Sequence, residues 1–390
     1  MAIEGRSDAA SGRLRLGMVG GGKGAFIGAV HRLAARMDDK YDFVAGALSS
    51  EPARSRASGR ELGLAKDRIY TDYREMAQKE AAREDGIDVV SIVTPNNVHI
   101  PAAMAFVEAG IHVICDKPLA HNLKEAQALQ KLLAKNRGVI FALTHNYSGY
   151  PMIRQAKAMV EAGDLGEIRL VQGEYPQDWL TNPIELTGQK QASWRTDPKQ
   201  TGAGGCIGDI GTHTYQLMTY VSGLKASELA ADLTTFVKGR KVDDNANVML
   251  RFRGGGRGML WASQVAPGNE NGLKLRVYGT KGGLEWTQAD PNYLWFTPFG
   301  EPKRLITRSG AGANAAAGRV TRVPPGHPEG YLEGFANIYT EVARAIQAKK
   351  ERRKLEAEVE FPGIADGVAG MAFIEACVKS SGHNARWTKL

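Results

Sequence analysis

The chain has few cysteines and no long apolar run, and both absences narrow its class. Only Cys115, Cys206 and Cys377 occur in 390 residues, and none belongs to a C-x-x-C pair. This spacing argues against a disulfide framework and a cysteine zinc site, and it favours a reducing, cytoplasmic location. No apolar stretch approaches the roughly 20 residues of a membrane span, and no signal-peptide core is present. We therefore expect no membrane partner.

The chain also lacks a block of one charge sign. Its net charge of +8 comes from 50 Lys and Arg residues scattered among 42 Asp and Glu residues. Scattered cations do not indicate a nucleic-acid surface, although a basic balance favours anionic ligands such as a dinucleotide. Residues 1–12 are small and polar and contain Ile-Glu-Gly-Arg, which reads as a protease linker. We predict a disordered tail or tag remnant there.

Strand-like and helix-like segments alternate in the first part of the chain. The expected strands cover residues 14–19, 43–48, 88–93, 111–115 and 139–144. Helix-length segments between strands predict βαβ units in a parallel sheet, with ligands at the carboxyl ends of the strands. We therefore predict an α/β dinucleotide-binding Rossmann domain over residues 13–144.

The later strands follow one another through glycine-rich turns such as 254–256 and 279–282. That order is typical of a mostly antiparallel sheet. A helix is expected over 209–221, and two more close the chain at 331–349 and 364–379. We predict a second, α+β domain over residues 145–390, whose C-terminal helix is a candidate for packing back on the first domain.

The first strand runs into Gly20-Gly21-Gly22-Lys23-Gly24, which opens a helix. A pyrophosphate needs close approach to backbone amides at a helix N-terminus, and glycine permits that approach. A glycine pattern alone is weak, because an ordinary strand-to-helix turn looks similar. Its place after the first strand favours dinucleotide binding. The expected contacts are Gly20, Gly22, Lys23, Ala25, Phe26 and Ile27.

The end of the second strand bears on the choice between NAD and NADP. An acid there binds the ribose 2′-hydroxyl of NAD, and a small or basic residue admits the 2′-phosphate of NADP. This chain has Ser49 and Ser50, with Arg54 nearby, and Glu51 could still reach the ribose. The arginine could equally be solvated helix surface. Both cofactors stay open.

A lysine follows the fourth strand in Asp116-Lys117-Pro118. Beside a cationic nicotinamide, Lys117 would have a lowered pKa and could share a proton with a substrate hydroxyl. A surface lysine is the alternative.

Asp209 and His213 are four residues apart on the helix expected over 209–221 and share one face. A carboxylate and an imidazole suit acid–base chemistry on a hydroxyl. A metal pair would need a third ligand nearby, so no metal is expected. A purely structural pair is the remaining alternative.

Three other residues are weaker candidates. Trp194 and Arg195 could stack on or clamp a ligand, although Trp194 could be core. His327 lies in a rigid Pro/Gly setting that can present a side chain to a ligand, or it is simply exposed.

Together these segments resemble the glucose–fructose oxidoreductase, inositol dehydrogenase and rhizopine-catabolism (Gfo/Idh/MocA) family from about Leu14 to Lys379. The resemblance is carried by residues 27–31, 94–99, 116–118 and 209–213. It implies an open-faced C-terminal sheet that commonly forms dimers or tetramers, and it slightly favours NAD. Two departures are Asp116, where the family has Glu, and about two extra residues in the glycine loop.

By this resemblance Lys117 is the catalytic lysine, and Asp209 and His213 complete the catalytic set. Further cofactor contacts are implied at Thr94, Pro95, Asn96, His99, Asp116, Lys117, Asn146, Trp194 and Arg195. Substrate contacts are implied at Lys117, Tyr147, Arg195, Asp209, His213 and His327.

The resulting hypothesis is an NAD(P)-dependent dehydrogenase acting on one carbinol of a small-molecule sugar or cyclitol. An NAD-dependent glycoside hydrolase needs the same cofactor and stays open. A non-catalytic dinucleotide sensor is a further alternative, which the Lys117, Asp209 and His213 set argues against.

Overall fold

The computed structural model describes residues 12–390, so residues 1–11 of the expected tail lie outside the described part. The chain divides into two compact units. The first contains the segments up to Ala120, Lys124–Gly149 and Tyr331–Val368. The second contains His121–Leu123, Tyr150–Gly330 and Ala369–Leu390.

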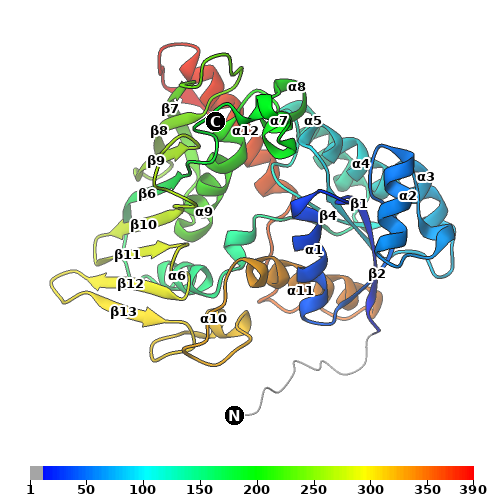
Figure 1. Cartoon of the computed structure of the whole chain (residues 1–390). Helices are drawn as coiled ribbons and strands as arrows, with labels where there is room; N and C mark the ends of the chain where they lie inside the picture. Colours follow the sequence, from blue (N-terminus) through cyan, green and yellow to red (C-terminus); the bar gives the residue numbers. More distant parts are fainter. Residues whose placement is uncertain (1–11) are drawn as a thin grey trace. The chain divides into compact units, whose positions relative to one another are not determined.

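The first unit is built on a five-stranded parallel sheet of order β2-β1-β3-β4-β5. Its strands are β1 (Leu14–Gly20), β2 (Tyr41–Ala47), β3 (Val89–Val93), β4 (His112–Cys115) and β5 (Phe141–Leu143). Its helices are α1 (Phe26–Met37), α2 (Pro52–Glu61), α3 (Tyr73–Ala81), α4 (Asn96–Glu108), α5 (Leu123–Lys135) and α11 (Tyr331–Lys350). Helices α1 and α11 lie on one side of the sheet, and α3 and α4 lie on the other (Figure 1). This arrangement confirms the predicted Rossmann fold.

The position of helix α11 departs from the predicted division of the chain into domains at residue 145. It belongs to the first unit because its apolar side chains join the core beneath the sheet. Phe335, Tyr339 and Val342 are buried there with Leu14 and Val30. A segment far along the sequence therefore completes the dinucleotide-binding unit.

The second unit is built on a nine-stranded sheet of order β13-β12-β11-β10-β6-β9-β8-β7-β14. Its strands are β6 (Ile168–Pro176), β7 (Ala226–Thr234), β8 (Asn245–Phe252), β9 (Arg257–Ser263), β10 (Lys274–Gly279), β11 (Gly282–Thr287), β12 (Tyr293–Pro298), β13 (Arg304–Thr307) and β14 (Thr388–Lys389). Every pair is antiparallel except β6 with β9, as the predicted mostly antiparallel sheet requires.

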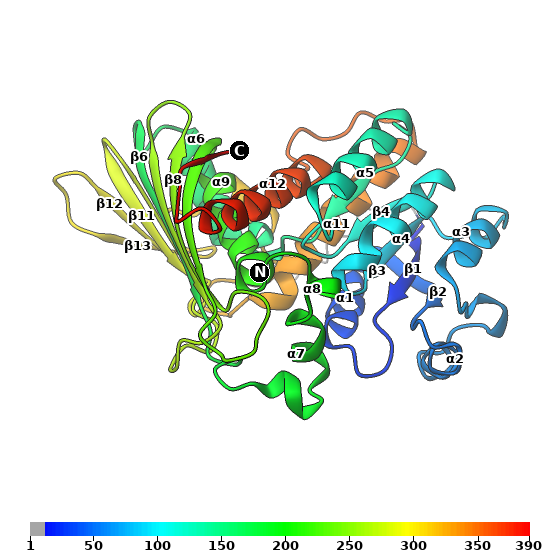
Figure 2. The ribbon, with the colours of Figure 1, turned by 90° about the horizontal axis from the view of Figure 1, so that it is seen from above.

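The helices of the second unit are α6 (Pro151–Glu161), α7 (Lys190–Arg195), α8 (Pro198–Thr201), α9 (Thr212–Ser222) and α10 (Ala315–Arg319). Helix α12 (Ile364–Ser381) begins in the first unit and continues in the second. Helices α6 and α9 cover one face of the sheet, and the opposite face carries no helix within residues 12–390 (Figure 2). No helix in this described range is long and apolar enough to cross a bilayer.

Candidate active site

The glycine turn after β1 is closely packed at Gly22 and against Gly28 of α1. A Cβ on Gly22 would lie 2.6 Å from the carbonyl oxygen of Leu48, and a Cβ on Gly28 would lie 2.3 Å from Cα of Gly21. Gly20, Gly21 and Gly24 adopt the left-handed conformation that favours glycine. The turn therefore runs close against the start of α1, as a dinucleotide-binding turn requires.

The start of α1 keeps its backbone donors available for a ligand. Its N-cap residue, Ala25, makes no side-chain capping bond. The first amides of a helix lack partners within the helix and favour an anion. Lys23 and Phe26 are exposed beside these amides. The turn and this helix end thus fit a pyrophosphate, and Ala25, Phe26 and Ile27 lie at the start of the helix.

Two residues that sequence reasoning missed hold this turn. The hydroxyl of Ser58 on α2 accepts a 3.0 Å hydrogen bond from the amide of Lys23. The guanidinium of Arg32 on α1 donates a 2.8 Å bond to the carbonyl of Gly21. Neither has a recognisable motif, because each reaches the turn only through the packing of its helix.

The end of β2 presents the polar residues expected near the adenosine ribose. The hydroxyl of Ser49 accepts a hydrogen bond from the amide of Glu51, and Ser50 is exposed. Arg54 forms a 3.1 Å ion pair with Glu51, and both side chains are more than half exposed. Such a pair contributes little stability, so either charge is available to a ligand.

Asp116 organises the end of β4. Its Oδ1 accepts hydrogen bonds of 2.9 Å from the hydroxyl of Thr144 and 2.9 Å from the backbone amide of Lys117. The Thr144 contact joins the ends of β4 and β5. The shorter acid in this Asp-Lys-Pro segment is therefore held by its neighbours and fixes the backbone that carries Lys117. Thr144 is a third residue that sequence reasoning missed.

Two buried histidines, His99 and His145, flank the Asp116-Lys117-Pro118 segment. The ring nitrogens of His99 lie 2.8 Å from the carbonyl oxygen of Pro118 and 2.9 Å from that of Thr94, so its ring links two strand ends. His145 lies after β5, and burial, with the nearby charge of Lys117, lowers its pKa to about 3. His145 is therefore neutral near physiological pH.

Asn146 and Tyr147 are almost fully buried in a 3-10 turn (Asn146–Gly149) after β5. The amide nitrogen of Asn146 is buried and has no hydrogen-bond partner within residues 12–390. A buried unpaired donor is costly, which is consistent with a ligand group that would accept from it. The residues of this unit thus fit a bound nicotinamide dinucleotide.

In the second unit, Asp209 and His213 lie on consecutive helical segments. A π-helical turn (Ile207–Gly211) carries Asp209 and runs directly into α9, which carries His213. The predicted single helix over 209–221 was therefore incomplete, since its first turn is wider than an α-helix. Such π turns occur often at functional sites.

The carboxylate of Asp209 is held by two side chains. Its Oδ2 lies 3.2 Å from Nε of Arg195 and accepts a 2.8 Å hydrogen bond from the amide of Gln264. The Arg195 guanidinium is itself fixed by Gln191 and lies 4.2 Å from the ring centre of Trp194. The structure thus joins the predicted residues Trp194, Arg195 and Asp209, and it adds Gln264.

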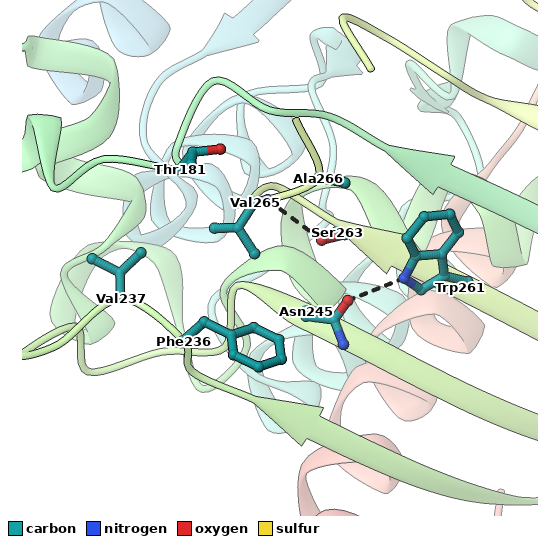
Figure 3. Close-up of a pocket in the computed structure, with 8 residues that line it drawn as sticks. All are labelled: Thr181, Phe236, Val237, Asn245, Trp261, Ser263, Val265 and Ala266. Carbon is teal, nitrogen blue, oxygen red and sulfur yellow. Dashed lines mark hydrogen bonds between the residues drawn. The ribbon is translucent and has the colours of Figure 1, made fainter. Parts of the chain in front are cut away.

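His327 lies elsewhere in the second unit. It lines a small pocket of about 220 Å³ with residues that include Asn292, Tyr293 and Arg308, and with none of Arg195, Asp209 and His213. A larger hollow of about 480 Å³ lies at the ends of β8 and β9, where the indole of Trp261 donates to Asn245 (Figure 3). This larger hollow is lined by none of the predicted site residues.

Both units match models of one family. Residues 14–145 match the oxidoreductase family with an NAD-binding Rossmann fold, and residues 153–285 match the GFO/IDH/MocA C-terminal domain. The chain belongs to the Gfo/Idh/MocA oxidoreductase family. It is an NAD(P)-dependent oxidoreductase, as the sequence predicted.

Solved structures and curated relatives agree with this assignment. An oxidoreductase from Sinorhizobium meliloti is 59% identical, with a TM-score of 0.88 over 97% of this chain and 100% of that one. An inositol dehydrogenase homologue from Azotobacter vinelandii, complexed with NADH and myo-inositol, is 36% identical, with a TM-score of 0.90 over 97% and 98%. Levoglucosan dehydrogenase from Pseudarthrobacter phenanthrenivorans is 29% identical over 70% of this chain and 73% of its own.

Proposed function

We propose that this oxidoreductase transfers a hydride between NAD(P) and one carbinol carbon of a cyclitol or an aldopyranose-type sugar. The observation that carries the proposal is the placement of Lys117. It follows β4 directly, on a backbone that Asp116 holds, within a unit whose turn and helix end fit a dinucleotide. A substrate hydroxyl beside such a lysine would be polarised for oxidation.

The substrate class rests on the polar set of the second unit and on the relatives. Asp209, Arg195 and Gln264 offer a carboxylate, a guanidinium and an amide in one group. Several donors and acceptors together suit a neutral ligand with many hydroxyls. The similar proteins include one complexed with myo-inositol and one named for levoglucosan, which are both polyhydroxylated rings.

Each residue has a proposed role in the reaction. His213 accepts the hydroxyl proton, because imidazole titrates near neutral pH. Lys117 donates a hydrogen bond to the same oxygen and stabilises its developing negative charge. Asp209 orients the neighbouring hydroxyls, and Arg195 and His327 are further substrate contacts. Bound nicotinamide supplies the hydride acceptor or donor.

Two finer proposals concern the cofactor and assembly. Thr94, Pro95, Asn96, His99 and Asn146 are proposed to contact the nicotinamide half, and Ser49, Ser50 and Arg54 the adenosine half of NAD or NADP. The cytoplasm is the proposed location, which fits three cysteines that form no disulfide.

We also propose that the chain forms a homodimer or homotetramer through its open sheet face. One row of directly paired residues crosses this face, namely Met249, Met259, Gln172, Arg276, Glu285, Trp295 and Leu305. Met249, Met259, Trp295 and Leu305 are each at least 40% exposed. Apolar side chains around a central charged pair suit a self-complementary interface.

A spectrophotometric screen tests the proposed reaction. Inositols and aldoses are offered with NAD and with NADP, and reduced nicotinamide is followed by its absorbance. Reduction with at least one cyclitol or sugar is expected. Release of a free aglycone without net reduction would instead indicate a glycoside hydrolase, and no turnover on the panel would refute the proposed substrate class.

A further inference from the structure

Asp243 contacts the start of the turn that carries Asp209. Its Oδ1 accepts a 2.6 Å hydrogen bond from the amide of Gly205, and its Oδ2 accepts a 2.8 Å bond from the amide of Ile207. The amide of Cys206 donates a 2.8 Å bond to the backbone carbonyl of Asp243. Three consecutive amides therefore end on one aspartate.

The site is buried and closely packed. Asp243 is 7% exposed, and a Cβ on Gly205 would lie 2.3 Å from the carbonyl oxygen of Asp243. Burial raises the pKa of the Asp243 carboxyl to about 6, against the bonds from Ile207 and Gly205, which lower it. Above that pKa the group is a carboxylate that accepts two charge-assisted hydrogen bonds, which are stronger than neutral ones.

Asp243 is linked to Asp209 through the backbone of Gly205. The amide of Asp209 donates a 2.8 Å bond to the carbonyl of Gly205, whose own amide is held by Asp243. The intervening π turn gives the backbone an unusual winding that local sequence does not enforce. The position and orientation of Asp209 on the π turn therefore depend on the hydrogen bonds by which Asp243 holds residues 205–207.

We propose that Asp243 is a positioning residue for the reaction, which places the carboxylate of Asp209 by anchoring the π turn. The inference rests on the proposed function, because it assigns Asp209 a role with the substrate. Asp243 acts through the backbone of residues 205–207 and is assigned no contact with a reacting group. Its removal should impair turnover while leaving the dinucleotide-binding unit unchanged.

The neighbouring Asp244 provides a matched control. Its carboxylate also accepts two backbone bonds, 2.9 Å from Phe236 and 3.0 Å from Val237, and it pairs with Arg240. It is fully buried as well. The bonds of its carboxylate hold the loop that lines the larger hollow (Figure 3) and not the Asp209 turn. Its backbone carbonyl accepts a 2.8 Å bond from the amide of Gln264, which Asp244→Asn leaves in place. Asp244→Asn therefore removes a similar buried clamp at a different place.

The experiment compares Asp243→Asn, Asp243→Glu and Asp244→Asn with the full-length wild type in mildly alkaline buffer. Asparagine presents an amide N–H to one backbone donor, and glutamate keeps both acceptors but displaces them by a methylene. We expect kcat on the best panel substrate to fall about tenfold to hundredfold in both Asp243 variants, since small misplacements of reacting groups are costly. Cofactor Kd should stay within about twofold, and kcat of Asp244→Asn should remain near wild type, with a lower Tm.

Hydrogen exchange of the peptide containing residues 203–214 gives a readout independent of activity. Faster exchange is expected in Asp243→Asn and not in Asp244→Asn, because only the first loses the anchor. Three results would each overturn the inference. The first is unchanged exchange of this peptide in Asp243→Asn, and the second is a wild-type kcat per cofactor-binding site in either Asp243 variant. The third is an equal loss of kcat in Asp244→Asn. If Asp243→Asn does not fold, the glutamate variant decides. A wild type inert on the whole panel would instead refute the proposed function itself, and the role of Asp243 with it.

Discussion

The ring of His31 and the hydroxyl of Tyr339 are 308 positions apart in the sequence and lie 2.8 Å apart in the structure. The same hydroxyl lies 2.8 Å from that of Ser91 on β3, and the hydroxyl of Tyr41 donates to the carbonyl of Tyr339. These contacts join α1, β2 and β3 to α11. Nε2 of His31 lies 3.9 Å from Oδ1 of Asp116, so the cluster lies directly beneath the Lys117 segment.

His31 makes stability depend on pH. Burial lowers its pKa from 6.5 to about 4, and Asp116 only partly opposes this. The unfolded chain therefore binds the extra proton between about pH 6.5 and 4, and the contribution of neutral His31 to stability is lost as pH falls through that window. This contribution amounts to roughly 3 kcal/mol at most.

We expect His31→Gln to lose less free energy of unfolding than wild type between pH 7 and pH 4. Denaturant titrations at several pH values measure the free energy of unfolding of both proteins. The contributions of the other titrating groups cancel in the difference between wild type and His31→Gln. The exposed His383→Gln variant serves as the control and should follow wild type. Parallel curves for wild type and His31→Gln would contradict a neutral, buried His31.

Replacing Lys117 should abolish turnover and spare cofactor binding. We expect Lys117→Ala to lower kcat by about 100-fold or more, as for other positioned proton-transfer groups. Binding of NADH, followed by its fluorescence, should change little, because the glycine turn and the start of α1 are intact. Lys131→Ala removes an exposed lysine of α5 as the control. Near-normal turnover of Lys117→Ala would mean that the assigned roles are wrong.

A carboxylate in place of the Gln264 amide should change the ionisation of Asp209. In Gln264→Glu a second carboxylate would meet Asp209, where the amide now donates at 2.8 Å. Two touching carboxylates cannot both stay ionised near neutral pH. We expect the acid limb of the kcat profile to move to higher pH by about one unit or more. Gln288→Glu, next to Asn271 in the same unit, is the control and should leave the profile in place.

Arg54 should discriminate between the two cofactors. If it contacts the 2′-phosphate of NADP, Arg54→Ala should weaken NADP binding about tenfold, the value of one charge-assisted hydrogen bond, and leave NAD binding nearly unchanged. Arg60→Ala on the same helix gives the control for charge alone. Unchanged binding of both cofactors would show that Arg54 is solvated helix surface, and equal losses would mean that it contacts a part that NAD and NADP share.

Local patterns in the sequence located most elements correctly. Periodicity and turn residues predicted the strand before the glycine turn, the strand before the Asp-Lys-Pro segment and the mostly antiparallel second sheet. They did not predict that β6 lies between β10 and β9. The helices α3, α7, α8 and α10 and the strands β12, β13 and β14 were missed. Their segments are short or polar, so their apolar periodicity is weak, and it is pairing with neighbours that stabilises them.

The sequence by itself determined the family, the dinucleotide turn and the candidacy of Lys117, Asp209 and His213, because these depend on residue types at fixed local spacing. Only the tertiary structure decided which side chains hold these candidate residues in place. Thr144 reaches Asp116, Gln264 reaches Asp209, and Asp243 reaches the π turn across 28, 55 and 36 positions. Such contacts arise when packed elements bring distant segments together, and no local pattern encodes that packing.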